Sequence, residues 1–428
     1  MFTKGVGDMG LNVAITGIGV VSALGHSPAE LYDRLALDEV AIREVPWTVG
    51  DPDRTEWWAP VTDLVPPEWM QGRKLEGIDP FAQNAGAAIT DALKNSGIET
   101  LDPLRTAIVI GTSKNGTQSM ERAQFDVDRG GRDSASGKYQ IRVWPNLAAS
   151  QIAMNWGLHG PCLTISTACA SSLDAIGTGA RLIASGQVDV ALVGGTEGGL
   201  GWRVWEDGFV PASAYSRSNF GMGAKTDDPR RACMPFDADR GGMVFGEGAG
   251  MFVLESEEHA RARGAEAHAW VQGWGTLSDA YHPSTPDPSG QWERLAMEVA
   301  LREAGADADQ IDVVAAHGTG TAKGDVAEIH AINDLFGDRA GEVSVMSVKG
   351  TLGHPTGAAG AIALATALEG LRRGEVMHTG GTTVPDPAIK FDLVLDKPKA
   401  RDIDWIQVNA FGFGGQNASL VVSRESQS

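Results

Sequence analysis

The chain has 428 residues, 42% of them hydrophobic and 21% charged, and this balance excludes collagen, coiled-coil and disordered proteins. At about 150 residues per domain, the length is enough for two or three domains. The 35 basic and 55 acidic residues give a net charge of −20, which repels phosphate backbones and anionic lipids, so neither nucleic acid nor a membrane is expected as a partner. Three cysteines without a CxxC pair favour neither a disulfide framework nor a zinc site, and they fit a cytoplasmic protein.

The first apolar run, Val13–Leu24, follows Lys4 in the manner of a signal peptide, but Asp8 and the glycines of this segment argue against secretion. Gly17 and Gly19 in the same run imitate the start of a dinucleotide fingerprint. The third glycine and the acidic residue expected at the end of a second strand are missing. A nicotinamide-dependent reductase is therefore a rival function that rests on two glycines alone.

Apolar runs typical of strands recur along the chain, with helical stretches between them. In chain order they are Val13–Ile18, Thr106–Ile110, Val188–Val193, Met251–Leu254, Ala269–Gln272, Ile311–Ala315 and Ser419–Val422. This alternation predicts an α/β chain whose sheets are largely buried. Pro46–Pro67 and Gly199–Arg231 are rich in Trp together with Pro or Gly and show no clear period, so we expect irregular excursions over the surface or along a pocket.

A faint internal repeat suggests that the chain has two related halves. Three pairs of segments match in the same order: Ile15–Gly19 with Val271–Gly275, Ala180–Val188 with Ala367–Val376, and the segments that begin at Phe245 and Phe413. Such order predicts a duplicated unit with its seam near Glu255–Glu266. We therefore expect an N-terminal half over residues 1–260 and a C-terminal half over residues 261–428.

The segment Leu163–Asp174 reads as an apolar strand, then Cys169, then small residues that open a helix. Unpaired N–H groups and the macrodipole at a helix N-terminus favour a thiolate, so this position suits a nucleophile. The alternative is a small buried hydrophobic residue, which most free cysteines are, and position alone does not decide between the two. We interpret Cys162 and Cys233 as residues of this second kind.

Two histidines occupy comparable places in the second half. His317 follows the apolar run Ile311–Ala316 and precedes a glycine turn, and His354 opens the small-residue part of Gly350–Leu368, a stretch without acidic or basic residues. Because Gly350–Leu368 is mostly Ala and Gly and contains a histidine and a proline, we expect a buried helix there and not a membrane span. The glycine-rich turn in Asn409–Leu420 offers backbone N–H groups as oxyanion donors.

Five motifs together resemble one family. They are TACASS around Cys169, AHGTGT with His317, the SxKxxxGHxxGAAG pattern with Lys349 and His354, PFDADRGGMVFGEGAG from Pro235, and the FGFGG turn from Phe411. In their order along the chain, and over essentially its whole length, they are similar to the β-ketoacyl-ACP synthases of the condensing-enzyme, thiolase-fold superfamily. The Cys, His, His set resembles the elongating branch, the synthase II type and its polyketide relatives, because the initiating branch has Asn in place of the second histidine.

The resemblance implies a thiolase-like αβαβα layered fold built from two related halves, and a decarboxylative Claisen condensation. Cys169 would accept the acyl chain, with its own N–H and that of Phe413 as the oxyanion hole. His317 and His354, as neutral imidazoles, would donate to the enolate oxygen that forms when malonyl thioester loses carbon dioxide. Phe413 would also be the gate of the acyl pocket.

The remaining family positions imply supporting roles. Lys349, Asp325 and Glu328 would form a charged network behind the histidines. Thr319 and Thr321 would hydrogen-bond the phosphopantetheine arm, which arrives on the carrier protein, so no metal or redox cofactor is expected. Two departures from the family pattern, Met234 before Pro235 and Gln416 after the glycine turn, remove no catalytic group.

The implied partner is an acyl carrier protein. Because such carriers are acidic and this chain is too, docking requires a local basic patch. The candidates are Arg73, Lys74, Lys225, Arg230 and Arg231, for which ordinary solvated surface charge is the alternative. A dimer is expected, either of this chain with itself or with a chain-length factor. A chain-length factor lacks the cysteine, so Cys169 argues against that identity for this chain, and fatty-acid and polyketide pathways both stay open.

Overall fold

The computed structural model describes residues 10–46, 55–72, 78–134, 140–199 and 227–427. Its main feature is an 11-stranded mixed sheet with the strand order β13-β11-β10-β15-β16-β9-β1-β8-β6-β4-β5. The strands of this sheet are β1 Val13–Ser22, β4 Thr106–Gly111, β5 Cys162–Ile165, β6 Val190–Glu197, β8 Gly248–Glu255, β9 Ala269–Ser278, β10 Val313–Ala315, β11 Ser344–Met346, β13 Asp392–Leu393, β15 Trp405–Gly412 and β16 Gln416–Ser423. Each of the seven predicted strands overlaps one of these, so that prediction is confirmed.

Two small sheets and the helices complete the described structure. The small sheets are β2-β3-β7, from Arg43–Pro46, Thr55–Ala59 and Phe245–Gly246, and β12-β14, from Glu375–Val376 and Lys399–Ala400. The α-helices are α1 Pro28–Ala36, α2 Pro80–Ser96, α3 Thr117–Gly130, α4 Gln140–Val143, α5 Leu147–Trp156, α6 Ser171–Ala184, α8 Glu257–Ala262, α9 Gln291–Ala304, α10 Gly324–Phe336, α11 Lys349–Leu352 and α12 Ala359–Arg373.

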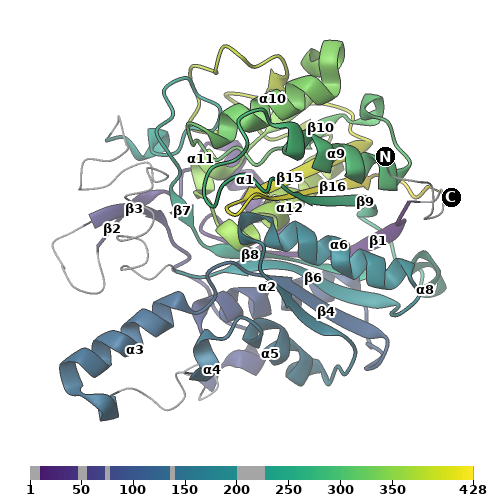
Figure 1. Cartoon of the computed structure of the whole chain (residues 1–428). Coiled ribbons are helices and arrows are strands. Elements are labelled where there is room, and N and C mark those ends of the chain that lie inside the picture. Colours follow the sequence, from purple (N-terminus) through teal and green to yellow (C-terminus); the bar gives the residue numbers. More distant parts are fainter. Residues whose placement is uncertain (1–9, 47–54, 73–77, 135–139, 200–226, 428) are drawn as a thin grey trace.

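Separate apolar clusters show that the elements form five layers. The largest cluster includes residues of α6 and α12 and of both halves of the sheet, so these helices lie between the two halves (Figure 1). A second cluster packs α2 and α5 against the outer face of β4, β6 and β8. A third packs α9 and α10 against β10, β11 and β16. The order helix, sheet, helix, sheet, helix is the αβαβα arrangement that the sequence predicted, and this fold class is confirmed.

The segments of the internal repeat take matching places in the sheet. β1 pairs with β9 at its centre through Val13–Ile15, and β8 and β16 are the next strands on either side. Their antiparallel neighbours on the far side, β6 and β15, also correspond. A six-stranded unit that ends in β9 and a five-stranded unit that begins with β1 therefore meet at the centre of the sheet. The division at residue 260 itself stays a prediction.

Two sequence predictions about individual segments have definite outcomes. All residues of α12 from Ala359 to Leu371 are buried between the sheets, as expected for a small-residue helix in a core. Across the described ranges, no helix combines the length and apolar character that crossing a bilayer requires. The expectation for Pro46–Pro67 was partly wrong, because β3 contributes Trp57 and Trp58 to a buried cluster. Gly199–Arg231 lies outside the described residues except at its two ends.

Candidate active site

The predicted site residues come from the carboxyl ends of strands on both sides of the sheet centre. Cys169 lies after β5, His317 after β10, and Lys349 and His354 after β11. Parallel pairing of β10 with β11 brings the loops that carry the two histidines together. The packing of both halves of the sheet against α6 and α12 brings Cys169 to the same place. The β15–β16 hairpin adds Phe413 from the second half.

Cys169 is fixed at a tight corner between β5 and α6. Ala168, just before it, has a φ of 51°, which is unfavourable for a residue with a Cβ. The Ser171 hydroxyl stabilises this corner, because it accepts from Thr167 N–H at 2.9 Å and donates to the Ala168 carbonyl at 2.6 Å. Gly412 packs so closely that a Cβ there would lie 2.9 Å from the Cys169 nitrogen. Only glycine fits that position without displacing the corner.

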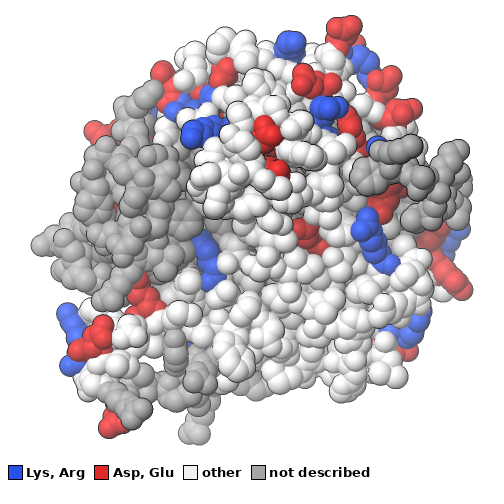
Figure 2. Space-filling view, viewed as in Figure 1, with Lys and Arg blue, Asp and Glu red and all other residues white. Residues whose placement is uncertain are grey.

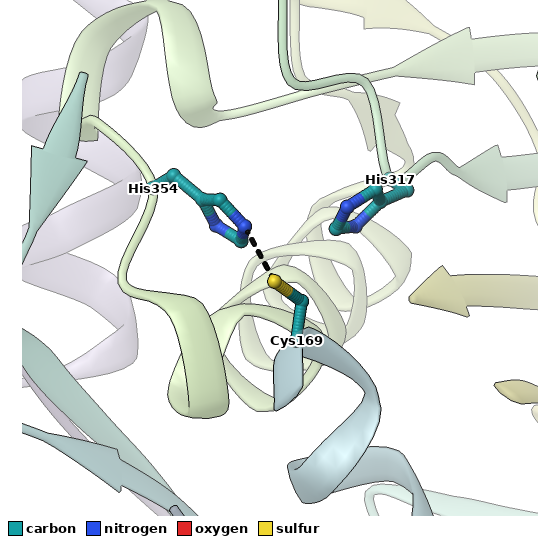
Figure 3. A group of neighbouring side chains, drawn as sticks. All are labelled: Cys169, His317 and His354. Carbon is teal, nitrogen blue, oxygen red and sulfur yellow. Dashed lines mark hydrogen bonds between the residues drawn. The ribbon is translucent and has the colours of Figure 1, made fainter. Parts of the chain in front are cut away.

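The sulfur of Cys169 and the two imidazoles converge on one point (Figure 3). His354 Nε2 lies 3.0 Å from Cys169 Sγ, and the His317 and His354 rings are 5.2 Å apart at their centroids with an interplanar angle of 80°. The sulfur and one nitrogen of each imidazole all lie within 4.8 Å of one another. The backbone bonds His354 N–H to Val244 carbonyl and Gly246 N–H to His354 carbonyl hold the second histidine in place.

Burial sets the protonation states of these groups. Burial raises the pKa of the Cys169 thiol to about 11, although the Lys349 and Lys114 ammonium groups and the Phe413 N–H act in the opposite direction. Burial, assisted by Lys349, lowers the pKa of both His317 and His354 well below the ordinary histidine value. The resting site is therefore a neutral thiol beside two neutral imidazoles. This differs from the expected thiolate at a helix end, because desolvation outweighs the nearby positive charges.

The protonation state of Cys169 can be tested by its reaction with iodoacetamide. Because only the thiolate reacts and the pKa is about 11, the alkylation rate of Cys169 should rise about tenfold per pH unit between pH 7 and pH 9. The rate is measured by intact mass, with the exposed Cys162 replaced by alanine. A rate that is already constant above pH 7 would contradict a resting thiol and would instead indicate a thiolate–imidazolium pair.

Behind the imidazoles, a buried charged network holds the backbone of the AHGTGT segment. Glu328 accepts from the backbone N–H groups of His317 and Gly318, each at 2.7 Å, and the Lys349 ammonium donates to the His317 carbonyl. Burial raises the pKa of Glu328 to about 7 and lowers that of Lys349. Neither side chain touches the sulfur, so both orient His317 through the backbone and contribute charge from a distance.

Asp325, one turn before Glu328 in α10, also holds the backbone of the AHGTGT segment. Its carboxylate accepts from Thr319 N–H at 3.0 Å, from the Thr319 hydroxyl at 3.2 Å and from Phe236 N–H at 2.6 Å. The Thr319 and Thr321 hydroxyls lie 2.9 Å apart. Gly320 between them has a φ of 75°, so the turn that presents both hydroxyls on one side depends on glycine there.

These groups line a cavity of about 410 Å³. Its wall includes Cys169, His317, His354, Thr319, Thr321 and Phe413. The Phe413 side chain is half-buried and packs against the cluster around Trp57 and Trp58, which is compatible with the predicted gate, whose movement stays a prediction. The cavity can hold a slender substrate whose reactive carbon meets the sulfur and both imidazoles.

The predicted carrier-docking residues are only partly placed. Arg73, Lys74 and Lys225 lie outside the described residues. Arg230 is exposed, whereas Arg231 forms an ion pair of 3.3 Å with the buried Asp237 and is less available to a partner. The sequence analysis missed one basic residue near the site: the exposed Lys323 lines the cavity at the start of α10.

Two further polar residues near the site were also missed. Lys114, after β4, is 8% exposed, and its ammonium lies 4.7 Å from the centroid of the Phe245 ring without a hydrogen-bond partner among the described residues. Glu197, buried at the end of β6, accepts from the Ser113 and Thr356 hydroxyls, each at 2.7 Å, and so ties the loop after β4 to the segment after His354. Both residues sit at carboxyl ends of strands, and this position was the available signal.

Comparisons with known proteins agree with this geometry. Residues 11–260 match the model of the beta-ketoacyl synthase N-terminal domain, and residues 268–383 match that of the C-terminal domain. The 3-oxoacyl-[acyl-carrier-protein] synthase 2 of Rhizobium meliloti is 37% identical over 423 residues, covering 96% of this chain and 98% of the relative. A beta-ketoacyl synthase structure from Burkholderia phymatum is 33% identical with a TM-score of 0.87, covering 97% of this chain and 99% of that one. The structure of the ishigamide ketosynthase/chain length factor is 30% identical with a TM-score of 0.87, covering 96% and 98%. This chain belongs to the β-ketoacyl synthase family of condensing enzymes.

Proposed function

We propose that this enzyme lengthens an acyl chain by decarboxylative condensation with malonyl-ACP. The observation that carries the proposal is the convergence of one thiol and two neutral imidazoles in the wall of one cavity. In the first step the Cys169 sulfur attacks the thioester carbonyl of the acyl carrier, and His354 Nε2 accepts the thiol proton. The carrier sulfur then leaves with a proton, and the acyl group remains on Cys169.

The second step needs no base that removes a proton from carbon. Malonyl thioester loses carbon dioxide, and the electron pair of the broken carbon–carbon bond forms an enolate. Its oxygen requires hydrogen-bond donors, which neutral His317 and His354 supply in a site sheltered from water. The enolate carbon attacks the acyl carbonyl on Cys169, so a carbon–carbon bond forms and the carbon–sulfur bond breaks. The product is a β-ketoacyl chain on the malonyl carrier.

Relatives at high coverage support the elongating reaction and a carrier-bound substrate. The name of the Rhizobium meliloti relative contains both the acyl carrier protein and the synthase 2 type. The second histidine in this chain, which the initiating branch lacks, fits the same type. The nicotinamide-reductase alternative rested on Gly17 and Gly19, and the structure places both in the buried core strand β1. There a Cβ on Gly19 would collide with the Ala88 carbonyl, so both glycines have a packing reason.

A direct experiment tests the proposal. The protein is incubated with a panel of acyl-ACPs, its intact mass is measured, and malonyl-ACP is then added while the products are analysed. We expect a mass increase equal to one acyl group, followed by loss of that group and appearance of a chain that is longer by two carbons. Absence of acylation with every chain length, by the protein alone and with a co-expressed partner, would overturn the proposal.

We also propose that the enzyme is a dimer that forms along the free edge of β5. No described strand pairs with this edge, and open edges carry unpaired backbone N–H and C=O groups. Leu163 on β5 and Met154 on α5 are 42% and 67% exposed. The helix α3, which contacts α4 next to α5, has no buried residue. Figure 2 shows that the surface over α5 is nearly free of charged side chains. Such an uncharged, apolar strand edge is typical of an interface.

A charge on this edge should separate the subunits. In Leu163→Glu, two carboxylates would meet across a symmetric interface, so we expect a monomer at micromolar concentrations, where the parent protein sediments as a dimer. Leu37→Glu is the matched control, because Leu37 is 74% exposed at the C-terminal cap of α1 and lies away from β5. A dimer that persists in Leu163→Glu would show that the interface lies elsewhere. Native mass spectrometry of the parent protein, alone and with a co-expressed chain-length factor, decides between homodimer and heterodimer.

We propose that the reaction needs no metal and proceeds in the cytoplasm, with phosphopantetheine supplied by the carrier. Cys169, His317 and His354 are arranged like a set of metal ligands, so the absence of a metal from the reaction can be tested with a chelator and with added metal. We expect acylation and condensation rates to remain unchanged after treatment with EDTA. Added Zn²⁺ should inhibit, because it would occupy the sulfur and the imidazole nitrogens that the reaction uses. Loss of activity with EDTA and recovery with a metal would contradict the proposal.

A further inference from the structure

A buried glutamate lines the cavity that holds the catalytic groups, and one of its carboxyl oxygens has no hydrogen-bond partner among the described residues. Glu293 lies in the first turn of α9, is 2% exposed, and is part of the cavity wall. Its Oε2 atom is buried without a hydrogen bond among the residues that the structure describes. A buried polar atom in this state costs free energy, so a residue of this kind at a cavity wall points to a group that is present only when substrate is bound.

Glu293 has no evident structural task in α9. A glutamate at this position of a helix often bonds back to the N-cap N–H, but Gly290 N–H bonds to the Asp287 carbonyl at 3.1 Å instead. In the described structure no cation forms an ion pair with Glu293. The helix is anchored otherwise, through Met297, Ala300 and Leu301 in the third apolar cluster. The fold therefore does not explain the carboxyl group.

The surroundings of Glu293 determine the form in which it is present. Burial raises the pKa of Glu293 well above the ordinary value, and the nearby carboxylates of Glu328, Asp279 and Asp325 act in the same direction. The burial and the neighbouring negative charges both favour the carboxylic acid over the carboxylate, and the acid offers one O–H donor and one carbonyl acceptor side by side. Anionic substrate groups are disfavoured here because four other acidic side chains, those just named and Asp287, act on Glu293. A neutral group with one donor and one acceptor fits best.

We propose that Glu293 binds an amide group of the carrier's phosphopantetheine arm, donating to its carbonyl and accepting from its N–H. A secondary amide presents these two groups as the complement of a carboxylic acid. The arm is the one neutral, amide-bearing part of the substrate that must lie in this cavity in both half-reactions. This inference rests on the proposed function, in which the arm passes Thr319 and Thr321 to reach Cys169.

The contacts around α10 connect Glu293 with the two threonines of the AHGTGT segment. Asp325 fixes the Thr319 backbone and hydroxyl, and it is also one of the carboxylates that act on Glu293. Gly290, at the start of α9, packs so closely on α10 that a Cβ there would lie 2.2 Å from the Ala327 carbonyl. Glu293 and the two threonine hydroxyls therefore belong to one rigid wall, and together they are positioned to bind an extended chain of alternating methylene and amide groups.

The test compares substrates that differ in their amides. Acylation of Cys169 is followed by intact mass with acyl-pantetheine, which has two amides, and with the same acyl group on a simple alkanethiol, which has none. For Glu293→Leu we expect kcat/KM with acyl-pantetheine to fall about tenfold, as for one lost hydrogen-bonded group, and kcat/KM with the alkyl thioester to remain unchanged. Comparing each variant with the parent on the same substrate removes the difference in leaving-group reactivity.

Two variants control for indirect effects. Glu293→Gln keeps a donor and an acceptor at the same place, so it should retain most of the acyl-pantetheine rate. Glu298→Leu changes another glutamate of α9, which is paired with Arg294 and does not line the cavity, and it should leave both substrates unaffected. Glu293→Leu should also melt at a higher temperature than the parent, because it removes an unpaired buried carboxyl group.

Three outcomes would overturn the inference. They are an equal loss with both thioesters, no loss with either, or a loss in Glu293→Gln as large as in Glu293→Leu. Failure of the proposed function looks different, because the parent protein itself would then not be acylated by any acyl-ACP or acyl-pantetheine.

Discussion

Replacing Cys169 with alanine is expected to abolish acyl transfer while malonyl-ACP is still decarboxylated. Removing the nucleophile should lower condensation by about a thousandfold or more, because no covalent acyl intermediate can form. Decarboxylation depends on donors to the enolate oxygen, and His317 and His354 remain in place. Without an acyl group to attack, the enolate takes up a proton, and acetyl-ACP accumulates.

The measurement uses intact mass for acylation and product analysis for acetyl-ACP. Cys162→Ala is the matched control, because Cys162 is exposed on β5 and is not part of the cavity. It should be acylated at the parent rate. If Cys169→Ala still gained one acyl group and condensed it, the nucleophile would be another residue, and the assignment of Cys169 would be wrong.

The position of the site was predictable from sequence because it depends on the ends of strands. Thr106–Ile110 and Ile311–Ala315 are apolar runs that can only be buried, and parallel pairing aligns the loops that follow them. Glycine turns such as Gly318–Gly320 fix where a side chain leaves the strand. The strand-end location of Cys169, His317 and His354 follows from these local signals, and their roles follow from the family motifs.

What could not be predicted depends on burial by distant parts of the chain. The helix end at Cys169 favours a thiolate, but the amount of chain packed around the sulfur decides its pKa, and no local pattern gives that amount. Lys114, Glu197 and Glu293 read as ordinary polar residues in the sequence. Each becomes notable only because elements from elsewhere bury it. The buried strand β3 was missed for the same reason, since its Trp57 and Trp58 pack on a cluster built by residues 232–245.

Replacing either of the two histidines is expected to affect acylation and decarboxylation differently. His354 Nε2 lies 3.0 Å from Cys169 Sγ, whereas the described structure shows no hydrogen bond between His317 and the sulfur. His354→Ala should therefore slow both acylation and decarboxylation, and His317→Ala should slow decarboxylation while acylation stays near the parent rate. Each lost donor to the enolate should cost a factor of about 100 to 1,000 in decarboxylation.

The pH dependence provides an independent check of the same pair. Because burial lowers the pKa of both imidazoles well below 6.5, the fraction of neutral histidine is already near its maximum at pH 6.5 and falls only as the solution becomes more acidic. Decarboxylation by Cys169→Ala should therefore be constant from about pH 6.5 to pH 8 and decline below that range. Replacing His330, which is half-buried and does not line the cavity, with alanine should alter neither rate. Equal losses of acylation in His317→Ala and His354→Ala would contradict the division of roles, because only one of the two imidazoles lies within reach of the thiol proton.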